Sequence, residues 1–111
     1  MFYWLFPSRQ DADKDPLLIW LSGGPGCSSE LALFAENGPL LIKNGEAVVN
    51  PISWNNKANL VFIDQPIGTG FSKASITHIP RNENTVAEHF GIFLSGFYEK
   101  YPEFIGRPLF V

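Results

Sequence analysis

The sequence predicts an α/β fold built on a mostly parallel sheet, of which this chain holds the first part. Two segments, Leu17 to Leu21 and Asn59 to Ile63, have the length of strands and are apolar at every position except Asn59. Continuous runs are typical of parallel strands, because helices cover both of their faces. Each run ends in a glycine-rich turn, and helical patterns alternate with the strands. This is the order of βαβ units.

Composition excludes several classes of function. The 111 residues form one small domain or part of a larger one, and 45% of them are hydrophobic. The net charge is −3, and the Lys and Arg residues are scattered, so we expect no nucleic-acid partner. No apolar run approaches the roughly 20 residues that cross a bilayer, so we expect no membrane partner. The opening, Met1 to Phe6, is short and lacks basic residues, and no signal peptide is visible.

The first half of the chain begins with an expected strand at Phe2 to Phe6. The strand at Leu17 to Leu21 follows a polar turn and ends in a glycine-rich segment that continues neither a helix nor a strand. A helix is predicted from about Ser29 to Glu36, with serines at its start and a stop at Asn37-Gly38-Pro39. Helix and strand should therefore meet at the glycine turn.

A hairpin is expected next. Leu40 to Ile42 and Ala47 to Val49 flank Asn44-Gly45, the dipeptide that favours a type I′ turn. A loop around Trp54 then leads into the second buried strand, Asn59 to Ile63.

The longest helix is predicted from about Thr85 to Tyr101. Thr85 and Glu88 have the spacing of a capping box at its start. Apolar residues then recur at helical spacing and form a stripe: Val86, Phe90, Phe93, Phe97 and Tyr101. Residues 108–111 open a further strand, which predicts an unfinished sheet.

The segment at residues 20–29, W-L-S-G-G-P-G-C-S-S, carries the chemistry. Its glycines let the backbone present successive N–H groups, which can bind an anion or the negative oxygen of an acyl-transfer transition state. A tight strand-to-helix turn without a ligand is the alternative. Residues 24–29 also come within one residue of the dinucleotide-binding pattern G-x-G-x-x-G, whereas no P-loop pattern occurs.

The cysteine, the two histidines and a few polar residues in the turns each have an ordinary structural interpretation. Cys27 is the only cysteine, so it is either a small buried side chain or half of a disulfide with a partner outside this chain. His78 and His89 are expected at the surface, and neither has metal-ligand spacing. Asp64 is interpreted as a turn former. Ser28 and Ser29 are interpreted as helix caps, because no G-x-S-x-G nucleophile motif occurs.

At residues 20–29 the chain resembles the serine carboxypeptidase family, whose oxyanion loop reads W-L-N-G-G-P-G-C-S-S. Three further stretches agree in order. Residues 36–39 resemble E-x-G-P, residues 50–60 resemble N-P-x-S-W-N-x-x-A-N-L, and residues 64–72 resemble D-Q-P-x-G-x-G-F-S. The resemblance covers essentially the whole chain. It implies an α/β-hydrolase sheet and a single domain of which residues 1–111 are the N-terminal portion.

The resemblance implies roles for positions in the glycine segment. The Gly24 N–H would donate to the oxyanion. Gly23 and Ser22 would bind the free carboxylate of the peptide, although the family has Asn where this chain has Ser22. A hydroxyl reaches less far than an amide. Cys27 matches a family cysteine that pairs with one far downstream.

On the expected helix, Leu31 and Ala35 would line the pocket for the leaving residue, although by default they are core or groove residues. Glu36 matches an acid that shares a hydrogen bond with a glutamate before the nucleophile, although alone it would be a solvated charge. Two adjacent carboxyl groups raise one apparent pKa, which fits activity at acidic pH.

The implied activity is hydrolysis of the C-terminal residue of a peptide through an acyl-enzyme on serine, without a cofactor, in vacuoles or lysosomes or after secretion. The Ser, Asp and His of the triad would lie beyond residue 111, so we expect this chain alone to be inactive. Two alternatives remain open: a non-catalytic product or interaction module on the same half-sheet, and a nucleotide-binding α/β protein.

Overall fold

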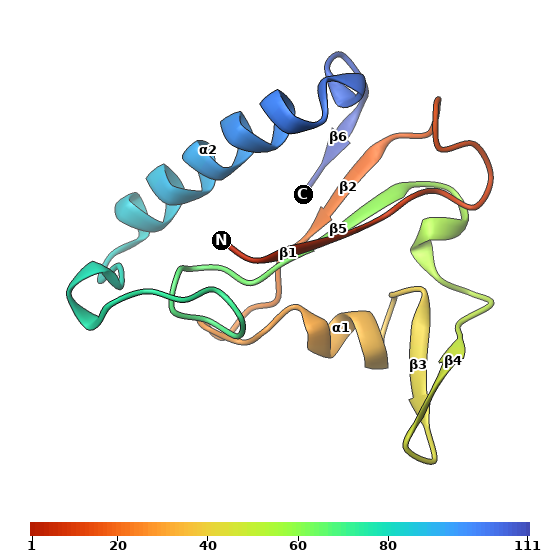
Figure 1. Ribbon diagram of the computed structural model, residues 1–111, viewed down its shortest axis with the longest axis horizontal. Coiled ribbons are helices and arrows are strands. Elements are labelled where there is room, and N and C mark those ends of the chain that lie inside the picture. Colours follow the sequence, from red (N-terminus) through yellow and green to blue (C-terminus); the bar gives the residue numbers. More distant parts are fainter.

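A four-stranded sheet in the order β1-β5-β2-β6 forms the centre of the structure, a computed structural model that describes residues 1–111 (Figure 1). Its strands are Tyr3–Phe6 (β1), Leu17–Trp20 (β2), Asn59–Ile63 (β5) and Leu109–Phe110 (β6). β2 pairs in parallel with both β5 and β6, whereas β1 is antiparallel to β5. The predicted α/β class with a mostly parallel sheet is confirmed.

Two helices and a hairpin complete the fold. The short helix α1 spans Glu30–Ala35, and the long helix α2 spans Glu83–Lys100. In Figure 1 they lie on opposite sides of the sheet. The hairpin of β3 (Leu40–Lys43) and β4 (Glu46–Val49) extends away beside α1. Three 3₁₀ turns lie between these elements: Trp54–Asn56 (η1), Ile76–His78 (η2) and Pro102–Phe104 (η3).

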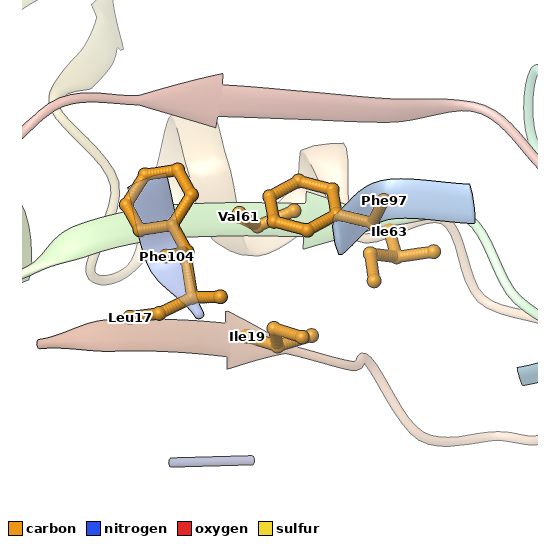
Figure 2. Packing of buried hydrophobic residues seen from close by; sticks show 6 residues of the cluster. All are labelled: Leu17, Ile19, Val61, Ile63, Phe97 and Phe104. Carbon is orange, nitrogen blue, oxygen red and sulfur yellow. The ribbon is translucent and has the colours of Figure 1, made fainter. Parts of the chain in front are cut away.

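The side chains of β5 alternate between two hydrophobic layers. Val61 and Ile63 point toward α2, and Leu60 and Phe62 point toward α1. The layer under α2 is the larger one and also contains Leu17, Ile19, Phe97 and Phe104 (Figure 2). The layer under α1 is completed by Ala32 and Leu33. Both faces of β5 are therefore covered, which explains why its sequence is apolar at consecutive positions.

The hairpin turn has the predicted type I′ geometry. Asn44 and Gly45 have φ angles of 54° and 82°, and this turn requires positive φ at both central positions. The N-terminus of α2 differs from the prediction. The helix begins at Glu83, and the side chain of Asn82 accepts a 2.9 Å hydrogen bond from the Thr85 N–H. The capping box predicted at Thr85 is wrong, because Asn82 caps the helix three residues earlier.

Candidate functional site

Residues 22–28, here called the glycine loop, follow the end of β2 and lead into α1. Residues 23–27 are exposed. The N–H groups of Gly23 and Gly24 donate no hydrogen bond within the chain. Gly24 has a φ of +141°, and a Cβ there would lie 2.9 Å from the Cys27 sulfur. Only glycine fits this position without strain, and the loop presents donors that no other part of the chain uses.

Ser29 fixes both ends of the glycine loop. Its side chain is fully buried, and its hydroxyl accepts the Ser22 N–H at 3.1 Å and donates to the Ile63 carbonyl at 2.6 Å. Ser29 occupies the N-cap position of α1, yet its side chain makes no capping bond. The predicted role as a capping serine is therefore wrong, because the hydroxyl joins the loop to β5.

Asp64 is a second anchor. It follows β5 directly and is fully buried. One carboxylate oxygen accepts the Ser29 N–H at 2.9 Å, and the other accepts the Phe71 N–H at 2.7 Å. The interpretation of Asp64 as a turn former was too limited. Its carboxylate joins the start of α1 to the turn after β5. The signal in the sequence was an acidic residue placed directly after four consecutive apolar residues, 60–63.

Glu30 is a site residue that sequence reasoning missed. The Ser28 hydroxyl donates to Glu30 Oε2, and Oε1 is buried without a donor. Burial raises the pKa of Glu30 above its ordinary value, and the neighbouring Asp64 carboxyl raises it further, while the Ser28 hydroxyl lowers it. Glu30 is thus an acidic group at the start of α1 whose pKa lies above its ordinary value.

A groove runs between α1 and β3. Its volume is about 540 Å³, and Leu31 and Ala35 line it together from one face of the helix. The remaining lining residues are Ser28, Glu30, Phe34, Leu41, Ile42 and Lys43. Leu31 is 61% exposed, so it is a groove residue rather than part of the core. The groove can accept an apolar side chain.

Glu36 ends α1 with an exposed side chain. Its backbone is held by the buried Asn50, whose amide donates to the carbonyls of Gly38 at 2.8 Å and of Glu36 at 3.4 Å. Gly38 is required beside them, because a Cβ there would overlap the Leu33 carbonyl oxygen. The E-x-G-P stretch therefore sets the direction in which the chain leaves the helix.

The sequence profile described as serine carboxypeptidase matches residues 1–111. The chain belongs to the serine carboxypeptidase family. Serine carboxypeptidase 3 of Hordeum vulgare is 48% identical over 113 residues, which cover 100% of this chain and 22% of the barley protein. A pheromone-processing carboxypeptidase of Phytophthora infestans is 43% identical over 95% of this chain and 18% of its own length.

The fold leads to the same family. The crystal structure of a prohormone-processing carboxypeptidase from Saccharomyces cerevisiae superposes with a TM-score of 0.79 and 36% identity, over 96% of this chain and 24% of the yeast chain. The 111 residues thus span about a quarter or less of the carboxypeptidases that they match. The site residues therefore describe one part of a carboxypeptidase fold.

The remaining predicted residues lie as follows. Cys27 is exposed with a free thiol. His78 is exposed, and its Nδ1 lies 2.5 Å from the Ser75 hydroxyl. His89 is only half-exposed and its Nδ1 is buried without a partner, so its placement at the surface was partly wrong.

No group of three or more His, Cys, Asp or Glu residues could hold a metal ion, and no helix is long and apolar enough to cross a membrane.

Proposed function

We propose that residues 1–111 supply the oxyanion and substrate-carboxylate loop of a serine carboxypeptidase, an enzyme that removes the C-terminal residue of a peptide through an acyl-enzyme on serine. The observation that carries the proposal is the pair of unused N–H groups of the exposed residues Gly23 and Gly24, which follow a parallel strand. Donors preorganised in this way stabilise negative oxygen without rearranging during the reaction.

The roles follow from the positions. The Gly24 N–H donates to the oxyanion, while Gly23 and the Ser22 hydroxyl bind the free carboxylate of the substrate. Glu36 supports this carboxylate site through a carboxyl partner that lies outside residues 1–111. Leu31 and Ala35 contact the side chain of the leaving residue. Cys27 forms a disulfide with a cysteine outside these residues, in a vacuolar, lysosomal or secreted enzyme.

The chain alone hydrolyses no peptide under this proposal. The 111 residues contain no G-x-S-x-G motif, and neither histidine lies beside the glycine loop in sequence. The negative oxygen forms only when a nucleophile attacks the substrate carbonyl. Without a nucleophile, the N–H donors of the glycine loop have no charge to stabilise. Hydrolysis of a blocked dipeptide by this chain, if abolished by a serine-directed phosphonate, would show that a serine among these residues is a nucleophile and would contradict the assignment.

A graft tests the positive part of the proposal. Residues 1–111 replace the matching segment of the barley carboxypeptidase, with which they share 48% identity. We expect the graft to hydrolyse blocked dipeptides. Alanine at position 24 keeps the N–H but displaces it, because a Cβ there would lie 2.9 Å from the Cys27 sulfur. We expect Gly24→Ala to lower kcat by up to about 10² to 10³, the usual effect when one oxyanion donor is lost. Gly45→Ala is the matched control, because Gly45 also has a positive φ but lies in the distant hairpin turn.

Ser22→Asn in the same graft tests the carboxylate site. An amide reaches further than a hydroxyl, so we expect a lower KM for substrates with a free C-terminus and no change for amidated ones. A folded graft without activity would favour the non-catalytic alternative, an interaction module on the same sheet.

A further inference from the structure

The carboxyl group of Asp64 has no solvent to stabilise its charge. It is fully buried, and its two oxygens each accept one backbone N–H, from Ser29 and from Phe71. Gly70 closes the space above it, because a Cβ at Gly70 would overlap Asp64 Oδ2. These contacts hold one carboxylate at the junction of the glycine loop, α1 and the turn after β5.

A second carboxyl group meets the first. Glu30 follows Ser29, whose N–H donates to Asp64, and the Asp64 carboxyl group is near enough to raise the pKa of Glu30. Its Oε2 already accepts from the Ser28 hydroxyl, and its buried Oε1 has no donor in the chain. Two ionised carboxylates in this position would repel each other in surroundings of low polarity. A single proton shared between the two carboxyl groups would remove this repulsion and join them by a hydrogen bond.

We propose that Glu30 is a positioning residue: its carboxyl group keeps a proton, donates it to Asp64, and so holds the glycine loop in the geometry that the oxyanion site needs. The proton-sharing pair is a property of this chain, whereas its effect on hydrolysis rests on the proposed function. This pair is separate from the Glu36 site, which lies at the other end of α1.

The charged groups around Glu30 determine the direction of its pH dependence. Asp64 faces it from the end of β5, and Lys43 of β3 lines the same groove from the other side. Burial and Asp64 raise the pKa of Glu30 above its ordinary value of 4.5. The stabilising contribution is therefore complete below that value, and it is lost as the pH rises through the raised pKa.

Amide hydrogen exchange measures this loss directly. The Ser29 and Phe71 amides report on the two bonds to Asp64. After correction for the intrinsic rate, we expect their protection to fall by up to roughly tenfold for each pH step of one above the ordinary pKa, the slope for release of a single proton. Protection should level off above the raised pKa.

Three variants test whether the effect comes from the proton of Glu30 or from the packing of its side chain. Glu30→Gln keeps a donor toward Asp64 at every pH, so the protection of the Ser29 and Phe71 amides should be high and independent of pH. Glu30→Ala should lose protection at every pH. Glu36→Gln is the matched control at the exposed end of the same helix, and it should retain the wild-type pH profile. A carbon-13 label on the glutamate side chains should show Glu30 titrating above its ordinary value.

Two results would overturn the proposal: Glu30 titrating at its ordinary value, or a Glu30→Gln variant with the same pH slope as the wild type. Activity is a separate measurement in the graft with the barley enzyme. There we expect Glu30→Gln to retain kcat/KM at higher pH than the wild-type graft does, with KM little changed. An inactive graft with the expected exchange profile would refute the proposed function and leave the proton pair standing.

Discussion

Two glycine-rich turns follow the two central parallel strands, and they use their backbone in opposite ways. The glycine loop after β2 is exposed, and its Gly23 and Gly24 amides bond to nothing in the chain. The turn at residues 67–72 after β5 is closed on itself: Gly68 N–H donates to the Ser72 carbonyl at 2.7 Å, and Ser72 N–H donates to the Thr69 carbonyl at 2.8 Å.

The first polar residue after each strand accounts for the difference. β5 is followed by Asp64, whose buried carboxylate draws in the Phe71 amide and leaves no room for a side chain at Gly70. β2 reaches the glycine loop through Ser22, whose own amide bonds to Ser29. The glycines of the second turn allow close packing, and those of the first leave donors free. Glycine content alone therefore does not distinguish a structural turn from a binding loop.

Removing the Asp64 carboxylate should have the largest effect on stability. Asp64→Ala leaves the Ser29 and Phe71 amides without acceptors in a buried position, and bonds to charged groups contribute about 1.5–3 kcal/mol each. We expect unfolding in urea to show a loss of roughly 3–5 kcal/mol. Asp13→Ala, at an exposed acidic residue, should change the unfolding free energy by less than about 0.5 kcal/mol. Equal effects of the two substitutions would contradict the anchoring role.

The second turn should also be intolerant of a side chain. Gly70 has a φ of +51°, and a Cβ would overlap the Asp64 carboxylate. We expect Gly70→Ala to lower the unfolding free energy by about 2–4 kcal/mol, because it combines strain with displacement of a buried acceptor. The exchange rate of the Phe71 amide should rise with it. Normal Phe71 protection in a stable Gly70→Ala variant would show that the turn does not depend on this contact.

Much of the fold follows from local patterns in the sequence. The run from Asn59 to Ile63 coincides with β5, and Asn44-Gly45 forms the expected turn. Both signals are local: a buried strand needs consecutive apolar residues, and a type I′ turn needs residues that tolerate positive φ. The glycine loop was found for the same reason, since it interrupts both regular patterns.

The anchors of the loop could not be predicted in this way, because they depend on contacts between distant segments. Ser29 and Asp64 are 35 residues apart in sequence, and each looks like an ordinary cap or turn residue in its own segment. Glu30 begins a helix, where an acidic residue is common, and only the sheet brings it to Asp64. The groove at Leu31 and Ala35 likewise required β3 to fold back against α1.

The smallest expected effect distinguishes the two turns most sharply. A Cβ at Gly23 would have no atom within 4 Å of it, and the φ of Gly23 is not positive. An alanine there meets no steric barrier, and it reduces the freedom of the unfolded chain, which stabilises proteins by about 0.4–1 kcal/mol at compatible sites. We therefore expect Gly23→Ala to leave the unfolding free energy unchanged or to raise it by up to about 1 kcal/mol, whereas Gly70→Ala lowers it. Urea unfolding of the two variants side by side makes the measurement. If Gly23→Ala were as destabilising as Gly70→Ala, the glycine loop would be packed as tightly as the second turn, and its amides would not be free to bind a substrate.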